Sequence, residues 1–266
     1  PPPPPPQERK PPRAITAPLV FRPEDISVLA TLKPITRIRL KPLSQEAAEF
    51  AFTASEWLQI GRPPGDVDFN AQFRPRSSVN DARTKRIGRN QSRTRFHDAK
   101  AEFAEDSPVN PSVYLDELVN GTVELALPAK LLLAGEYPLE IHRVESDYKG
   151  PREIQNAPWR DESAPPGALV LRAGEGSGVL LCEAALVLSD VTFHFTQSGR
   201  PWFRVDATAT PSLRVHHLGG QFWMEALDKS SLRHDATDEI SSPHVPLLLL
   251  PGKKIRIGGY AYAVEA

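Results

Sequence analysis

The chain has 266 residues, of which 40% are hydrophobic and 24% charged, and this balance excludes a wholly disordered protein. Its single cysteine, Cys182, excludes an intramolecular disulfide, and no apolar run approaches the roughly 20 residues of a membrane-spanning helix. Residues 1–100 hold 18 Lys and Arg against 10 Asp and Glu, whereas the other 166 residues hold 14 against 23. A basic front and an acidic back favour an anionic partner for the front, or an acidic surface on a neighbouring subunit.

Residues 1–43 predict an extended, proline-rich arm. Pro1–Pro6 favours polyproline II, which has no internal hydrogen bonds and cannot build a core. The stretch Ile26–Leu40 alternates well enough for one or two short strands, and Pro34 would confine them to an edge. Such an arm is expected to pair with the sheet edge of a neighbouring subunit.

Residues 44–60 predict a short helix. Ser44 is a suitable cap, and apolar residues including Phe50 and Trp57 fall on one helical face. A strand over 49–53 is the alternative, because aromatic residues also alternate there.

Residues 72–100 form the most basic stretch, with nine Lys and Arg against two Asp. Apolar residues are few and show no period, so we predict a loop or flexible segment. Such a segment can neutralise phosphates through counterion release, or it can dock on an acidic protein surface. Phe73 and Phe96 bracket the run and are candidates for stacking on bases. The predicted contacts to nucleic acid or another polyanion are Arg74, Arg76, Arg83, Lys85, Arg86, Arg89, Arg93 and Arg95.

Residues 101–266 predict a β-rich body. A second short helix is expected at 111–119, because Asn110 can cap it and Pro111 suits its first turn. The expected strands are 122–127, 139–144, 168–173, 179–188, 191–196, 202–207, 213–217, 245–250, 254–257 and 260–264. Short strands at this spacing indicate a mainly β fold, a β-sandwich of jelly-roll-like type. The expected organisation is therefore an arm over 1–43, a helix plus basic flexible segment over 44–100, and a sandwich over 101–266.

Glycines at alternating positions follow the strand 168–173. Gly174, Gly176 and Gly178 give this segment a likeness to the first motif of Rossmann-like methyltransferases, in which glycines let the backbone approach the cofactor. That family usually has an acidic residue two positions before the first glycine, where this chain has Arg172. The next predicted strand also leaves no room for a full helix. A glycine-rich hairpin is therefore the favoured interpretation.

Four histidines gather within 29 residues, and Asp235, Asp238 and Glu239 lie among them. His216 and His217 are adjacent, so in a strand their side chains point to opposite faces. The segment lacks an HxH or HExxH spacing. Ordinary surface histidines are therefore the favoured interpretation, although a site shared by His216, His234 and His244 stays open. We expect no catalytic residue, no cofactor and no metal.

The layout of arm, basic segment and β-sandwich is similar to that of icosahedral virus coat proteins, an architecture that hosts many functions. Our first hypothesis is a non-enzymatic structural subunit of a large assembly, a capsid or virion shell. Its partners would be copies of itself, other subunits and nucleic acid, with no membrane, and it would reside in the virion. The second hypothesis is a β-sandwich binding module for carbohydrate or protein, cytoplasmic, with Trp159, Trp202 and Trp223 as candidate contacts. The third is an enzyme that uses the glycine segment or the histidines.

Overall fold

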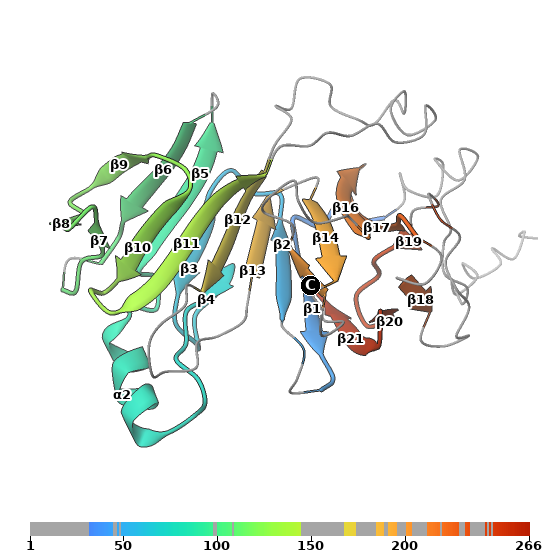
Figure 1. Ribbon diagram of the computed structural model, residues 1–266, viewed down its shortest axis with the longest axis horizontal. Helices are drawn as coiled ribbons and strands as arrows, with labels where there is room; N and C mark the ends of the chain where they lie inside the picture. Colours follow the sequence, from blue (N-terminus) through green and yellow to red (C-terminus); the bar gives the residue numbers. More distant parts are fainter. Residues whose placement is uncertain are drawn as a thin grey trace, which may run out of the picture.

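The computed structural model in Figure 1 describes twenty-one strands and one helix. The described residues are 32–44, 47, 49–97, 100–107, 109–144, 168–173, 185–188, 191–195, 201–203, 212–218, 220–228, 232–234, 243, 245 and 247–266. The mainly β prediction is confirmed. Within these residues, no helix is long and apolar enough to cross a membrane.

The largest element is a sheet of eleven strands that runs the length of the molecule (Figure 1). All neighbours are antiparallel except β13 and β2, which pair in parallel. In spatial order its strands are β18 (Leu232–His234), β20 (Lys254–Ile257), β21 (Tyr260–Glu265), β1 (Arg37–Pro42), β2 (Phe50–Thr53), β13 (Ala185–Leu188), β12 (Ala168–Ala173), β11 (Tyr137–Val144), β10 (Ala129–Leu133), β7 (Val113–Tyr114) and β8 (Glu117–Leu118).

Two smaller sheets of five strands accompany the long sheet. The first contains, in order, β15 (Pro201–Phe203), β14 (Val191–Phe195), β16 (Leu213–Leu218), β17 (Gln221–Ala226) and β19 (Leu247–Leu248). The second contains β4 (Phe69–Asn70), β3 (Leu58–Gly61), β5 (Ser92–His97), β6 (Lys100–Glu105) and β9 (Thr122–Leu125).

The two small sheets cover opposite faces of the long sheet, so the molecule contains two sandwiches that share it. Phe50 and Phe52 of β2 lie in a core with residues of β16 and β17, whereas Ala51 lies in a second core with residues of β3 and β6. Strand β12 divides in the same way, with Val170 in the first core and Leu171 in the second. Because successive strand residues point to opposite faces, the central strands bury both of their faces. This arrangement agrees with the predicted sandwich packing and places a second core beside the first.

Both predicted helices were wrong in position. The segment 44–60 instead contains β2 and most of β3, with Trp57 in the turn between them, because Phe50 and Phe52 both reach the first core only in a strand. The segment 111–119 forms the short hairpin of β7 and β8, whose turn residues Leu115 and Asp116 have positive φ angles of 51° and 62°. Positive φ at both central residues is the geometry of a two-residue hairpin turn.

The helix α2 (Ser78–Arg86) lies inside the stretch predicted to be a loop. Ser77 caps it by accepting a hydrogen bond from the backbone N–H of Asn80. Asp81 lies in its first turn and three cations lie in its last, which suits the helix dipole. The helix has no apolar stripe, and that is why periodicity did not predict it.

The end of the predicted arm belongs to the body of the protein. Strand β1 lies in the middle of the long sheet, between β21 and β2. The residues just before β1 bind the hairpin of β16 and β17, since Ile35 N donates to Gly220 O at 2.8 Å. Residues 1–31 lie outside the described residues, so the lacing role of the arm and the domain boundaries stay predictions.

Candidate functional site

The eight cations predicted to contact a polyanion are distributed over α2, the segments on either side of it and β5. Three of them, Arg83, Lys85 and Arg86, lie in the last turn of α2, and Arg74 and Arg76 precede the helix. The other three follow it: Arg89 lies in the loop after α2, and Arg93 and Arg95 lie on β5.

Carboxylates form ion pairs with four of the eight cations. Glu136, in the turn between β10 and β11, binds both Arg83 and Arg86. Asp106 binds Arg93 at 3.1 Å. Arg95 binds Glu102 at 2.6 Å and Glu56 at 2.9 Å. A cation that already has a carboxylate partner releases few counterions on binding phosphate, so these ion pairs do not favour a polyanion groove.

The two aromatic residues predicted to stack on bases are not available for it. Phe73 is fully buried, with the guanidinium of Arg83 4.2 Å from its ring centre. Phe96 packs against the second core beneath Arg143. The half-buried Trp57, which the sequence analysis placed on a helix and not among the contacts, instead lies under the guanidinium of Arg95, 4.5 Å from its ring centre.

Three loops meet at one end of the sandwich that contains the second core, the same end as α2 (Figure 1). We call them the loop face: residues 62–66 after β3, residues 87–91 before β5, and the described residues of 106–112 after β6. The backbone N–H of Arg62 donates to Gly88 O at 3.0 Å, and Asn110 Nδ2 donates to Arg86 O at 2.9 Å. Segments far apart in the sequence are therefore joined at this end.

The fully buried side chain of Gln91 joins two of these loops to the end of β6. Its Oε1 accepts from the backbone N–H of Gly88 at 2.6 Å. Its Nε2 donates to Glu105 Oε1 and to Asn110 O, both at 2.8 Å. One side chain thus joins the loop before β5, the end of β6 and the loop after β6.

Glu105 is the second anchor of the loop face. Its carboxylate accepts from the backbone N–H groups of Ser107 at 3.0 Å and Ser112 at 2.8 Å, besides Gln91. Burial raises the pKa of this carboxyl, and the hydrogen bonds offset part of that rise. The hydrogen bonds therefore stabilise the ionised form of Glu105, and the carboxylate in turn fixes the positions of the groups that donate to it.

Close backbone contact requires glycine at the edge of the loop face. A Cβ atom on Gly61 would fall well inside the contact distance of the Arg89 carbonyl oxygen, and one on Gly65 would lie 2.7 Å from the same atom. The backbones of Arg62 and Arg89 are therefore adjacent, although 27 positions separate them.

Two arginines of the loop face have no carboxylate partner among the residues that the structure describes. The Nε atom of Arg62 is buried and lacks a hydrogen-bond partner there, while its Nη1 reaches only Pro63 O at 3.4 Å. Arg89 is exposed. The Oγ atom of the fully buried Ser92, at the start of β5, also lacks a partner within the described segments. The sequence marked Arg89 by its charge but gave no reason to single out Arg62.

Strand β1 holds the loop after β3 from the other side. Arg37 binds Asp66 at 2.6 Å and the buried Asp68 at 2.5 Å. Arg39 Nη2 donates to Val67 O at 2.5 Å and to the carbonyl oxygen of Asp68 at 3.0 Å. The sandwich that contains the first core therefore helps to position the loop face.

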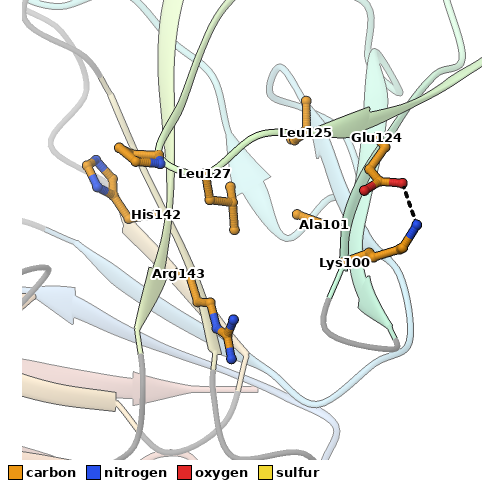
Figure 2. A pocket seen from close by; sticks show the side chains of 8 residues that line it. Lys100, Ala101, Glu124, Leu125, Leu127, His142 and Arg143 are labelled. Carbon is orange, nitrogen blue, oxygen red and sulfur yellow. Dashed lines mark hydrogen bonds and ion pairs between the residues drawn. The ribbon is translucent and has the colours of Figure 1, made fainter.

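A shallow cleft of about 360 Å³ lies between β6, β9 and β11 (Figure 2). Lys100 and Glu124 bind each other at 2.8 Å on one wall, as the dashed line in Figure 2 shows. His142 and Arg143 form the other wall, but successive residues of a strand point to opposite faces. Figure 2 shows this divergence, so the cleft does not bring reactive groups together.

His142 belongs to a small polar cluster on the long sheet. Its Nε2 lies 3.2 Å from Glu140, which also accepts from Arg172 at 2.7 Å. Burial lowers the pKa of His142. Burial acts to raise the pKa of Glu140, but the hydrogen bonds of His142 and Arg172 outweigh it and lower that pKa. The polar groups of this cluster therefore bind one another, with Glu140 between His142 and Arg172.

The enzyme candidates fall largely outside the described residues. That is the case for Gly174–Gly178 and for His244, and for the side chains of His216 and His234. Within the part of the chain that is described, no three His, Cys, Asp or Glu residues are grouped as metal ligands. Among the tryptophans proposed as contacts, Trp223 is buried, Trp159 lies outside the described residues, and so does the side chain of Trp202.

Comparisons with known proteins leave the family open. No protein-family model matches the chain, and no curated protein does. A solved structure titled "Rv0020c_FHA Structure" is similar over 39% of this chain and 89% of its own, with 17% sequence identity and a TM-score of 0.22. A likeness at that TM-score says nothing about what this chain binds.

Proposed function

We propose that this chain is a non-enzymatic binding module that recognises an anionic group on a protein partner through the loop face. The observation that carries the proposal is the buried Nε atom of Arg62, which has no acceptor among the described residues. A buried donor without an acceptor costs about 1–3 kcal/mol. Arg62 as a whole is only half-buried, so a ligand that draws its guanidinium toward an acceptor recovers part of that cost.

The loop face is suited to binding because its backbone is fixed before a ligand arrives. Gln91 and Glu105 hold the loops through five hydrogen bonds from buried or half-buried groups. A preorganised loop loses little conformational entropy on binding, so more of the interaction energy appears as affinity. Rigid loops on a β scaffold are a common location for recognition.

A single anionic group fits this surface better than a polyanion does. Four of the eight predicted cations already bind carboxylates, and both flanking aromatic rings are covered. Arg62 and Arg89 have adjacent backbones and no carboxylate partner in the described residues, and two such arginines suit one carboxylate or phosphate group. The shell-subunit role stays a prediction, because a single chain offers no intersubunit contact in its support.

The experiment is an array of synthetic peptides with varied neutral flanks, each made with a central Ser, Glu or phosphoserine. Peptides that bind are then titrated by fluorescence anisotropy. Arg62→Ala and Arg89→Ala should each weaken binding about tenfold or more, because a hydrogen bond to a charged group contributes about 1.5–3 kcal/mol. Arg76→Ala removes the same charge from an exposed residue before α2 and is the matched control.

The Glu and phosphoserine peptides distinguish the two sources of the anion. A preference for either one over Ser, with loss of binding in both loop variants and less than a twofold change in Arg76→Ala, supports the proposal. Equal binding of the Ser peptides, or equal losses in all three variants, contradicts it, because recognition would then rest on backbone contacts or on net charge.

A further inference from the structure

Asn120 and Gly121 form the one Asn-Gly pair in the sequence, and they lie in the connection between β8 and β9. An asparagine side chain can lose its amide when the backbone nitrogen of the next residue attacks it, and glycine favours the attack because it places no Cβ nearby. Two structural conditions apply. The side chain must be free to turn, and the N–H of the next residue must not be engaged with an acceptor.

The structure blocks this reaction at the four described asparagines other than Asn120. After three of them the next backbone N–H donates to a carbonyl oxygen, and after the fourth the next residue is proline, which has no N–H. The three bonds, after Asn70, Asn80 and Asn90, are Ala71 N to Gly61 O at 2.7 Å, Asp81 N to Ser77 O at 2.8 Å and Gln91 N to Ile60 O at 2.8 Å, and Pro111 follows Asn110. At these positions the attack would first have to break a hydrogen bond, or there is no proton to remove.

Asn120 meets both conditions. It is exposed, and its side chain makes no hydrogen bond with the described residues. The Gly121 N–H has no acceptor among those residues either, although the Gly121 carbonyl oxygen accepts from Glu105 N at 2.9 Å. Gly121 has a φ of +75°, and a Cβ placed on it would meet no atom within 4 Å apart from its chain neighbours. The Gly121 nitrogen is therefore open to the Asn120 side chain.

We propose that Asn120 is a site of spontaneous deamidation. The Gly121 nitrogen loses its proton and attacks Cγ of Asn120, the Cγ–Nδ2 bond breaks, and the amide nitrogen takes up a proton and leaves as ammonia. The product is a five-membered succinimide ring. One water molecule then opens the ring at either of its two carbonyl carbons, which gives aspartate or isoaspartate. The reaction consumes only water and releases only ammonia.

Both products change the edge of the loop face. Asn120 lies between two backbone hydrogen bonds that reach it: Val119 N donates to Ser112 O at 2.8 Å, and Gly121 O accepts from Glu105 N at 2.9 Å. Aspartate adds a negative charge there, which opposes the binding of an anionic ligand. Isoaspartate adds the same charge and also a CH₂ group to the backbone between the two bonds, so it loosens the connection between β8 and β9.

The reaction is tested by incubating the full chain in mildly alkaline buffer at body temperature and mapping its peptides by mass spectrometry. A synthetic peptide of residues 116–126, incubated alongside, gives the rate of the same sequence without the fold. The folded chain should convert Asn120 within about tenfold of that rate, because no hydrogen bond has to break first. Asn90 is the internal control, since it is also exposed but is followed by the engaged N–H of Gln91, and it should not convert. An unchanged Asn120 while the synthetic peptide converts, or equal conversion at Asn90, would overturn the proposal.

Titration with the peptide selected in the array measures the consequence for binding, which rests on the proposed function. Asn120→Asp carries the new charge from the start and should bind about threefold more weakly, the size expected of one exposed charge. Asn120→Gln keeps an amide that would need a larger ring to react, so it should bind equally before and after incubation. Equal binding by Asn120→Asp and the unmodified chain would overturn the effect on the loop face. Failure of every array peptide to bind would instead contradict the proposed function, while the mass-spectrometric result would still decide the modification site.

Discussion

Replacing Gln91 by alanine should be among the most destabilising single changes in the loop face. The substitution removes one neutral hydrogen bond from Gly88 N, one neutral bond to Asn110 O and one bond to the Glu105 carboxylate. Neutral bonds contribute about 1 kcal/mol each, and a bond to a charged group contributes about 1.5–3 kcal/mol. The expected loss is therefore about 4 kcal/mol in the free energy of unfolding, a large share of the 5–15 kcal/mol typical of a domain.

The assay is urea denaturation followed by tryptophan fluorescence, with Gln59→Ala as the matched control. Gln59 is half-buried on the neighbouring strand β3, and its side chain has no hydrogen bond within the described residues, so its loss should be below about 1 kcal/mol. Gln91→Ala should also weaken peptide binding, although the side chain is not exposed. A loss below 1 kcal/mol for Gln91→Ala would show that water replaces its bonds, and the argument for a fixed loop face would fail.

Three other changes test the account, each by denaturation. Gly61→Ala should cost about 3 kcal/mol and weaken peptide binding, because its Cβ would collide with the Arg89 carbonyl; unchanged stability would show that the loops are not pressed together. Asp68→Ala should cost about 3 kcal/mol, and Arg37→Met in the same chain should restore part of it; a further loss instead would contradict the buried pairing. Burial lowers the pKa of His217, so the unfolded chain binds its proton more readily, and stability should fall as pH decreases below about 6.5; His217→Gln should make that fall less steep, and an identical slope would remove this histidine as a cause.

Alternation predicted some of the strands that bury one face, but it missed β10, whose burial also alternates. Residues 122–125 and 260–265 alternate as expected, and both form strands. Strand β17, over 221–226, was not predicted, because all six of its residues are buried and the sequence shows no alternation. Helix α2 escaped prediction for a related reason. Its cap and its ion pairs with Glu136 stabilise it. Glu136 is 50 positions away from Arg86, so the local sequence pattern of the helix cannot predict this contact.

The candidate site was predictable only in part. The run of arginines placed positive charge near the correct loops, and Arg89 was among the predicted contacts. The carboxylates that bind the other arginines come from distant strands, so charge counting overestimated the cations available to a ligand. Gln91 carries no charge and belongs to no motif. Its importance arises only when two loops and the end of β6 converge on it.

The most direct test of the loop face as a binding site is a titration of the isotope-labelled chain with a peptide selected in the array, followed by two-dimensional ¹H–¹⁵N NMR. The account predicts saturable shifts of the backbone amides of Arg62, Arg89 and Asn110, with the same dissociation constant for all three, and loss of these shifts in Arg62→Ala. Binding that leaves these amides unmoved and shifts residues elsewhere would contradict the assignment of the loop face.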